Sequence, residues 1–467
     1  MKLAAVLDEI GLAPLWRSPL DTKLLCAQRF VRLFAYGGST LVLASYLSAL
    51  DISDDRIGLF MTLTLVGDVL ISFFLTLFAD AVGRKAVLLL GSALMCVSGL
   101  VFALSGNYWL LLVAAVFGVI SPNGNEIGPF RAVEESTIAH ITSNENMSDI
   151  LTWYLLFGSA GTALGMMVCG WTMTLLQETK GWDFVAACRV VFLIYAAVGA
   201  VKFLLTAGLS KSVEAAKKEK QQPREQPSNE GQPSETEPLL DSEPETQPTA
   251  GARRSIPFLP GVEAQFVGLV TSVILLFALD SFASGLASLT WVTYFFRRKF
   301  GVAESRLGSL FSGTSIIQAL SMLVASSIAK RFGNVKTMVF THLPSTLCLA
   351  MIPIPSSLPI AMIFVILRAC TQNMDVAPRS AFLATALPPD QRTAIMGTIN
   401  VAKTSASSVA PLLTGLLAGR GLFWVSFVAA GALKASYDIG MLVTFGDTDR
   451  KMREEAAAEA ARRDEES

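Results

Sequence analysis

Long apolar runs dominate the chain, and short polar breaks separate them. Six runs fill residues 23–209, and six more fill residues 263–445. A helix needs about 20 apolar residues to cross a hydrocarbon core about 30 Å thick, so the pattern predicts twelve membrane-spanning helices in two sets of six. The expected spans are residues 23–50, 57–79, 86–105, 108–131, 149–176, 184–209, 263–295, 305–329, 337–355, 357–380, 393–418 and 422–445.

A polar segment separates the two sets of spans. Residues 211–262 are rich in Lys, Gln, Pro, Glu and Ser, and such a composition cannot bury enough apolar surface to fold. We therefore expect a disordered linker there, between a six-helix bundle at residues 23–210 and another at residues 263–446. We also expect a mixed N-terminal segment over residues 1–22 and a charged tail over residues 447–467 that ends as an Ala/Glu/Arg helix.

The composition excludes several classes of protein. Hydrophobic residues make up 52% of the 467 residues and charged residues only 16%, too few charges to cover the surface of a soluble protein of this size. A net charge of −1 gives no basic field for nucleic acid. The six cysteines and two histidines lack metal-site or disulfide spacing, and no phosphate-binding loop suggests ATP-driven transport. We expect a membrane protein that is not an enzyme and has no cofactor and no bound metal.

Lys and Arg residues predict the orientation in the membrane, since they accumulate on the cytoplasmic side. Their excess falls on the side of the termini and of the linker, so we expect both termini to be cytoplasmic. This orientation puts the glycosylation sequon at Asn146 on the cytoplasmic side, where it stays unmodified. The main exception to the rule is an outer cluster of basic residues, Arg297, Arg298, Lys299 and Arg306.

The loop between the second and third spans is short, charged and contains glycine, with the sequence Ala79-Asp80-Ala81-Val82-Gly83-Arg84-Lys85. It resembles a signature of the major facilitator superfamily of secondary transporters, Gly-x-Leu-Ala-Asp-(Arg/Lys)-x-Gly-Arg-(Arg/Lys)-x-x-Leu. The positions that match are Ala79, Asp80, Gly83, Arg84, Lys85 and Leu88. The positions that depart are Thr76, Phe78 and Ala81, which replace the first Gly, the Leu and the first basic residue.

The two halves of the chain repeat one another. Phe34-Ala35-Tyr36-Gly37 corresponds to Phe282-Ala283-Ser284-Gly285 at an offset of 248, and Gly83 corresponds to Gly333 at an offset of 250. Nearly equal offsets in separate spans indicate a duplicated six-span unit. The resemblance to the facilitator superfamily implies an all-α membrane fold, in which two parallel six-helix bundles related by a pseudo-twofold axis rock about a central site.

Charged residues inside a span usually face a cavity or a partner, because burying an isolated charge is costly. Asp68, near the middle of the second span, is our first candidate for proton coupling, since burial suits a carboxyl to bind a proton; Glu126 is the second. Arg32 and Asp280 occupy equivalent positions in the first span of each half. They could pair across the central cavity in one state and separate in another, or form a static pair, or Arg32 could extend to the membrane surface.

Further polar residues in the spans are candidates for a substrate cavity and a cytoplasmic gate. Two cations, Arg368 and Lys403, would favour an anionic substrate, or they could neutralise the nearby acids. We expect a polar loop after the fourth span, to about residue 148. The expected cavity residues are Arg32, Tyr36, Asn123, Asn125, Asp280, Arg368, Gln372, Asn400 and Lys403. The expected gate and loop-signature residues are Asp80, Gly83, Arg84, Lys85, Arg131, Asp375 and Arg379.

The resemblance implies a secondary active transporter that moves a small organic solute by alternating access. We expect proton-coupled export of a drug-like compound or a secondary metabolite. The alternatives are an importer of an anionic nutrient and a membrane sensor that transports nothing. The expected partners are the solute, protons and the lipid bilayer, without nucleic acid, and we expect a monomer. We expect a multi-pass protein of the plasma membrane rather than of a vacuolar or endosomal membrane.

Overall fold

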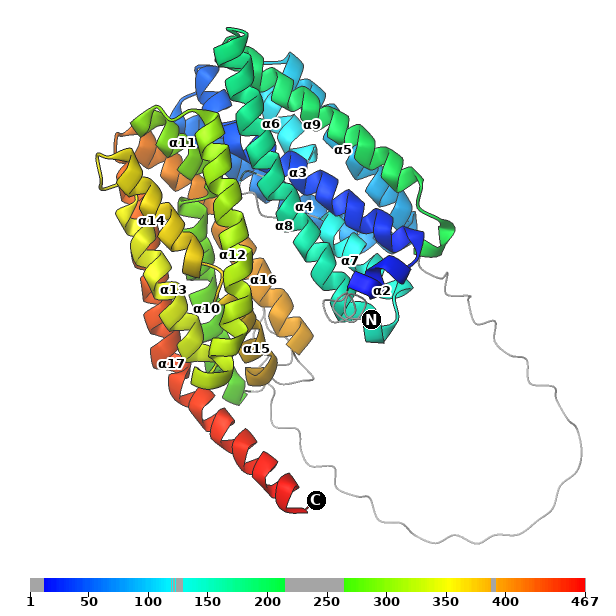
Figure 1. The fold of residues 1–467 in the computed structure, drawn as a ribbon, viewed down its shortest axis with the longest axis vertical. Coiled ribbons are helices and arrows are strands. Elements are labelled where there is room, and N and C mark those ends of the chain that lie inside the picture. The colour runs from blue at the N-terminus through cyan, green and yellow to red at the C-terminus, as the bar shows by residue number, and fades with distance from the viewer. Residues whose placement is uncertain are drawn as a thin grey trace, which may run out of the picture.

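The computed structural model describes residues 12–118, 120, 122, 129–214, 264–387 and 392–466. In this part the chain forms two bundles of helices that lie side by side (Figure 1). The first bundle, the N-half, contains α2 (Leu12–Arg17), α3 (Leu20–Ala49), α4 (Asp54–Val82), α5 (Arg84–Leu104), α6 (Tyr108–Phe117), α7 (Pro129–Ile141), α8 (Asn144–Thr174), the π-helical turn η1 (Leu175–Thr179), α9 (Phe184–Ala207) and the short 3-10 helix η2 (Lys211–Val213). The second bundle, the C-half, contains α10 (Ala264–Leu286), α11 (Leu289–Phe300), α12 (Glu304–Phe332), α13 (Asn334–Met351), α14 (Leu358–Thr371), α15 (Val376–Ala386), α16 (Arg392–Gly419) and α17 (Phe423–Glu466).

Polar residues fix where some of the apolar helices begin. The Asn107 side chain accepts hydrogen bonds from the backbone N–H groups of Trp109 and Leu110, at 3.0 and 3.2 Å. Asp183 accepts a bond from the N–H group of Val185 at 3.0 Å. The first turn of a helix leaves such N–H groups without partners inside the helix. The two side chains therefore stabilise the starts of α6 and α9.

The backbone confirms the duplication of the chain. Helices α4 and α12 each contain 29 residues, and their first residues, Asp54 and Glu304, are 250 positions apart. Gly83 and Gly333 follow these helices with φ angles of 107° and 93°. Glycine adopts such angles readily because it has no Cβ atom. The same sharp turn therefore joins α4 to α5 and α12 to α13.

Three of the expected spans are broken rather than continuous, which corrects the sequence prediction. The fourth span is divided into α6 and α7, the seventh is broken at residues 287–288, and the tenth at residues 372–375. Helix α7 begins at Pro129, and Pro378 lies in the first turn of α15. Proline has no backbone N–H, so it fits the first turn of a helix but interrupts a helix interior. Pro378 accounts in this way for the break in the tenth span, and the described part of α7 begins at the equivalent Pro129.

The polar loop expected after the fourth span is largely helical, which is a second correction. Helix α7 continues to Ile141, and α8 begins at Asn144. The side chain of Glu134, in the middle of this segment, is fully buried. The segment is therefore polar partly because it places a carboxylate among buried cations inside the N-half, while other polar residues in it, such as Arg131 and His140, are exposed.

The two halves touch at one end of the molecule. We call the end that carries α2, Glu214 and the start of α10 the linker end, and the opposite end the far end. At the far end α4 packs on α16, and α8 packs on α12. A Cβ atom added to Gly58 would lie 2.7 Å from the carbonyl oxygen of Pro411, and one added to Gly308 would lie 2.4 Å from that of Met166. Toward the linker end the ribbons of the two halves lie further apart (Figure 1).

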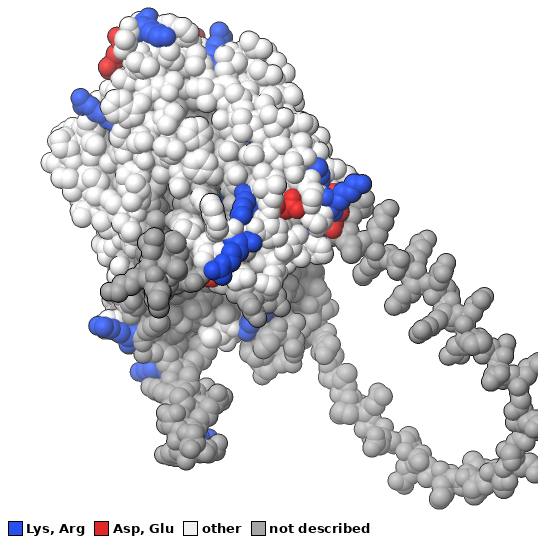
Figure 2. Space-filling view, turned by 45° about the vertical axis from the view of Figure 1, so that its right-hand side comes forward, with Lys and Arg blue, Asp and Glu red and all other residues white. Residues whose placement is uncertain are grey.

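The surface suits a lipid environment. Large apolar side chains point outward, including Phe73 at 64% exposure and Leu204 at 69%. Figure 2 shows a broad uncharged band on one face, with charged side chains near its upper edge and across its lower part. Seven helical segments of the described chain are long and apolar enough to cross a membrane. Other expected spans, such as α12 and α16, are richer in Ser and Thr.

Candidate functional site

A buried group of polar residues lies inside the N-half. It joins Arg32 of α3, Glu134 of α7, Tyr154 of α8 and Lys202 of α9, and we call these four residues the N-half cluster. A guanidinium nitrogen of Arg32 lies 2.8 Å from Glu134 Oε2, and Lys202 Nζ lies 3.6 Å from Glu134 Oε1. The hydroxyl of Tyr154 donates to Glu134 Oε2 at 2.6 Å. All four side chains are buried, so one carboxylate from the middle of the bundle holds three other helices together.

Aromatic rings support the cations of the N-half. The guanidinium of Arg29 lies 4.2 Å from the centre of the Tyr154 ring, and Lys202 Nζ lies 4.5 Å from the centre of the Phe130 ring. The face of an aromatic ring attracts a cation when water is excluded. These contacts reduce the cost of burying positive charge beside Glu134.

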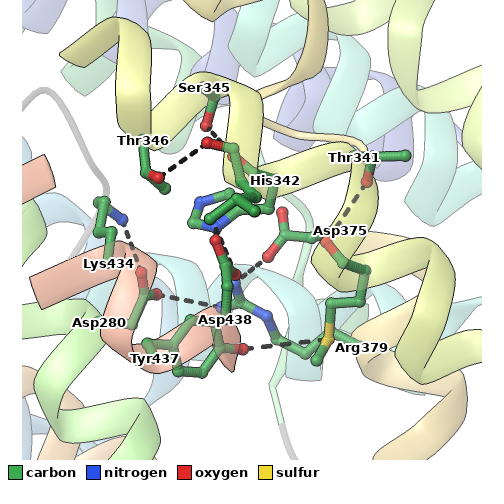
Figure 3. A network of polar contacts seen from close by, with 12 residues as sticks. Asp280, Thr341, His342, Ser345, Thr346, Asp375, Arg379, Lys434, Tyr437 and Asp438 are labelled. Carbon is green, nitrogen blue, oxygen red and sulfur yellow. Dashed lines mark hydrogen bonds and ion pairs between the residues drawn. The ribbon is translucent and has the colours of Figure 1, made fainter. Parts of the chain in front are cut away.

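A second buried network lies inside the C-half, and Figure 3 shows its residues. Lys434 Nζ of α17 lies 2.6 Å from Asp280 Oδ1 of α10. A guanidinium nitrogen of Arg379, on α15, lies 3.5 Å from Asp280 Oδ2, and Arg379 also pairs with Asp375 one turn earlier. The carboxylate of Asp280 therefore links α10, α15 and α17. We call the network of Asp280, His342, Asp375, Arg379, Lys434 and Asp438 the C-half network.

His342 and Asp438 complete the C-half network. His342 Nδ1 on α13 lies 2.9 Å from Asp438 Oδ1 and 3.0 Å from Oδ2 on α17. Their exposed fractions are 3% and 0%. Asp438 follows Lys434 by four residues, one helical turn, so the two side chains lie on the same face of α17. Arg379 also lies over the Tyr437 ring, at 5.5 Å from its centre.

Arg32 and Asp280, which the repeat placed at equivalent positions, each bind partners within their own half. Arg32 binds Glu134, and Asp280 binds Lys434 and Arg379. Neither of these bonds crosses between the halves. A direct Arg32–Asp280 pair in another conformation stays a prediction.

The other residues expected in a cavity or in proton coupling lie in different environments. Asp68 on α4 is 5% exposed, and Tyr36 is buried and stacks on Tyr195 with ring centres 6.5 Å apart. Lys403 Nζ lies 5.9 Å from the centre of the Phe277 ring, close to the C-half network. Arg368 and Gln372 are partly exposed, and Asn400 is exposed. The predictions for Asn123, Asn125 and Glu126 fall outside the described residues.

The loop signature anchors the end of the N-half to the first residues after α9. The Glu214 carboxylate accepts hydrogen bonds from the backbone N–H groups of Arg84 and Lys85, at 2.7 and 3.2 Å. Lys85 Nζ donates to the carbonyl oxygens of Ala207 and Leu209, at 2.9 and 2.5 Å. Glu214 thus caps α5 at its N-terminus, where a negative charge is favourable. The side chain of Asp80 lies outside the part of the chain that is described.

The residues expected at a cytoplasmic gate are not gathered in one place. Arg131 Nε pairs with Glu135 at 2.7 Å, on an exposed face of α7. Asp375 and Arg379 belong to the C-half network. A gate role for these residues in another conformation stays a prediction.

At the far end, an ion pair and hydrogen bonds connect the two halves. Asp54 at the start of α4 accepts a hydrogen bond from the Tyr294 hydroxyl at 2.7 Å and pairs with Arg298 on α11. Arg297 pairs with Glu304, whose carboxylate also accepts a bond from Gln177 of the N-half at 3.4 Å. We call Asp54, Gln177, Tyr294, Arg297, Arg298 and Glu304 the far-end clasp. A hollow of about 720 Å³ lies against it.

The far-end clasp and two nearby carbonyl groups account for three residues of the basic cluster that departed from the orientation rule. Arg297 and Arg298 are engaged with acids. Lys299 Nζ donates to the carbonyl oxygens of Pro353 and Pro355, at 2.5 and 2.8 Å. These charges therefore have specific partners between and beside the halves.

Sequence reasoning missed six residues of the two buried networks. The charges of Lys202, Lys434 and Asp438 lie inside expected spans, so the cost of burying a charge was a signal that could have found them. Glu134 lies in a segment interpreted as a loop, and His342 was considered only as a metal ligand. The missed residues are Glu134, Tyr154, Lys202, His342, Lys434 and Asp438.

Comparisons with known proteins agree with this architecture. The family model described as Major Facilitator Superfamily matches residues 25–283 and again residues 273–465. An uncharacterized membrane protein of Saccharomyces cerevisiae, YJR124C, is 35% identical over 442 residues, which cover 93% of this chain and 96% of that protein.

Solved transporter structures are similar in fold. The nucleoside transporter NupG is 15% identical with a TM-score of 0.64, over 91% of this chain and 98% of its own. The D-xylose-proton symporter is 12% identical with a TM-score of 0.64, over 90% of this chain and 96% of its own. At such low identity the likeness concerns the fold alone.

Proposed function

The chain belongs to the Major Facilitator Superfamily, and from that premise we propose that it exports a small organic solute by alternating access, driven by protons. The observation that carries the proposal is the burial of charged residues inside both halves. Charges inside a membrane protein are costly to keep, and they commonly mark solute and proton pathways.

Alternating access is supported by the way the halves meet. The hydrogen bond from Leu412 N–H of α16 to the Thr62 hydroxyl of α4, at 3.0 Å, crosses between the halves toward the far end. Trp171 Nε1 of α8 donates to the Ser309 hydroxyl of α12 at 3.2 Å in the same region. We take this as the conformation closed at the far end. Rocking the halves about these contacts would expose a central site to the opposite side.

Proton coupling is assigned first to Asp68 and second to Glu126. Asp68 is buried in α4, the helix that contacts α16 of the other half. A carboxyl at this place can bind a proton on one side of the membrane and release it on the other. Protonation would then alter the packing between the halves.

The orientation and membrane location are part of the proposal. We propose that the linker end faces the cytoplasm, because most Lys and Arg residues outside the spans belong to it. We further propose a monomer in the plasma membrane. Attachment of a glycan at Asn146 in cells would contradict this orientation.

An importer of an anionic nutrient is the second candidate. Among the described residues, the N-half buries three cations, Arg29, Arg32 and Lys202, around the Glu134 carboxylate. Asp21 and Asp68 are also buried in the N-half, but around Glu134 the cations outnumber the carboxylate, and a local surplus of positive charge favours a carboxylate or phosphate group on the solute. In that case uptake should fail when Arg32 or Lys403 loses its charge.

The test is flux in purified proteoliposomes under an imposed pH gradient, with pooled solutes. We expect a solute to move against its own gradient, and we expect this movement to be lost in Asp68→Asn. Flux that ignores the pH gradient would remove proton coupling. Ligand binding without flux would replace the transporter with a membrane sensor.

A further inference from the structure

The C-half network contains one pair of residues that differs chemically from the rest. His342 and Asp438 come from α13 and α17, and their side chains point at one another with water excluded (Figure 3). The imidazole Nδ1 lies within 2.9–3.0 Å of both carboxylate oxygens. Histidine is the residue that ordinarily gains or loses a proton near neutral pH.

The charges around the pair are nearly balanced without it. Lys434 and Arg379 carry two positive charges, and Asp280 and Asp375 carry two negative charges. Asp438 is a third carboxylate, and His342 is the group that decides whether the pair is negative or neutral. Without the proton, a neutral imidazole contacts the Asp438 carboxylate. With the proton, the contact becomes a buried ion pair, and the charge-assisted hydrogen bond in this geometry favours that state.

We infer that His342 and Asp438 together form a proton-binding site in the C-half, in addition to any site at Asp68. The inference deepens the proposed coupling to protons and rests on it. One imidazole and one carboxylate are fewer ligands than a structural metal site uses, whereas a shared proton needs only these two groups.

The site is connected to helices that must move in alternating access. Asp438 lies one turn from Lys434, and Lys434 holds Asp280 on α10. Helix α10 packs on α16, which in turn packs on α4 of the N-half. Asp438 and Asp280 both attract Lys434. A change in the charge of the His342–Asp438 pair therefore changes how strongly Lys434 binds Asp280, and so how firmly α17 is attached to α10.

Charged and titratable groups from the surrounding helices lie around the pair, and some of them act on Asp438 directly. Helix α17 contributes Lys434 and Tyr437 besides Asp438, α10 contributes Asp280, and α16 contributes Lys403. Helix α15 contributes Arg379, with Asp375 just before it. Helix α14 brings Arg368 near Cys348 of α13. Asp280 and Lys434 act on Asp438 itself, whereas Arg379 and Lys403 act on Asp280 and reach the pair only through it.

The first test follows the proton itself, because the chain has only two histidines, His140 and His342. Full-length protein with ¹⁵N-labelled histidine is placed in lipid bilayers, and the imidazole nitrogen signals are followed from about pH 5 to 8. His140→Gln removes the other signal and leaves the site untouched.

The site is supported if the His342 signal changes between its neutral and protonated positions in this range, and if Asp438→Asn moves that change. A His342 signal that stays the same across the range would overturn the inference. So would an identical titration in the protein with and without the Asp438→Asn change. Circular dichroism and gel filtration check that Asp438→Asn is folded.

A second test separates this inference from the proposed function. In proteoliposomes we expect His342→Gln to lower pH-driven flux by about tenfold, a usual size for coupling between two sites. Exchange of the same solute at equal pH on both sides should be preserved. Unchanged pH-driven flux would overturn the site's role. If the unaltered protein moves no solute at all, the proposed transport fails, while the titration of His342 still decides whether the pair binds a proton.

Discussion

Glu134 is the residue on which the interior of the N-half depends. Its carboxylate accepts a hydrogen bond from Tyr154 and pairs with Arg32 and Lys202, away from water. A buried ion pair adds little net stability when complete, because both charges were solvated in the unfolded chain, but losing one partner leaves the other uncompensated. The N-half cluster is therefore expected to affect stability mainly when one partner is removed, because the remaining charges are then buried without compensation.

We expect Glu134→Gln to lower the free energy of unfolding by about 3–5 kcal/mol, because Arg32 and Lys202 keep their charges and lose the carboxylate. Thermal unfolding in detergent measures the change. The control is the same substitution at the neighbouring Glu135, whose partner Arg131 has a side chain 45% exposed, and we expect a change within about 0.5 kcal/mol there. Equal effects at the two positions would contradict a special role for Glu134.

The two turn glycines should be equally sensitive, because they hold the same backbone angle in each half. Gly83→Ala and Gly333→Ala place a Cβ atom where φ is 107° and 93°, and we expect each to cost about 1–3 kcal/mol. Gly313→Ala is the control, since Gly313 lies within helix α12 and an added Cβ atom would have no neighbouring atom within 4 Å. It should be neutral or slightly stabilising. Thermal unfolding in detergent measures the change in stability of each variant. Unchanged stability of both Gly83→Ala and Gly333→Ala would show that the two turns do not require glycine.

At the scale of the elements, the short helix α11 is the part that closes the far end. It carries Arg297, Arg298 and Tyr294, and all three bind acids that lie at the start of other helices. The chain breaks before α11, and this segment packs on α3 of the N-half. The acids of the clasp thus lie at helix starts, beside the short loops that precede α4 and α12.

We expect Asp54→Asn to favour opening of the far end by about 1 kcal/mol, since Arg298 loses its ion pair in a partly exposed place. That corresponds to a shift of about fivefold between the two conformations. The distance between spin labels on the two halves at the far end measures it. Asp55→Asn is the matched control, because Asp55 is exposed and lines the same hollow. An equal shift from Asp55→Asn would argue against the clasp.

At the scale of the whole molecule, close backbone packing limits how the halves can meet. Gly58 and Gly415 face each other between α4 and α16, and Gly170 and Gly308 do so between α8 and α12. The two contacts are at equivalent places of the repeat, so the far end closes around a pseudo-twofold arrangement. Side chains of ordinary size at these four positions would keep the halves apart.

We expect Gly415→Leu to prevent closure of the far end, because a Cβ atom there would lie 2.4 Å from the Asp54 carbonyl oxygen. Transport should fall by more than about tenfold, while the folded protein persists with its far end open. Reaction of a cysteine placed at the far end with a water-soluble reagent measures the opening. Gly419→Leu, one turn later, is the control, since its nearest neighbours are 3.9 Å away. Normal transport by Gly415→Leu would contradict this packing role.

Much of the fold could be predicted from the chain, but the site could be predicted only in part. The length of the apolar runs predicted twelve spans, because it depends only on residues close together in the chain. The nearly equal offsets of the repeat predicted two bundles, because they require only a count of positions. Asp280, Asp375 and Arg379 were identified, but their common network was not. Their contacts depend on how α10, α15 and α17 rotate about their axes, which the pattern of polar residues does not specify.

By itself the sequence determined a membrane protein of two repeated bundles. A run of about 20 apolar residues is long enough to cross the hydrocarbon core of a bilayer as a helix, and few other environments can accommodate it. Only the tertiary structure decided the partners of the buried charges. Arg32 binds Glu134, 102 positions away, and His342 binds Asp438, 96 positions away. A local pattern shows that a buried charge requires a partner, but which distant residue supplies it depends on the packing of whole helices.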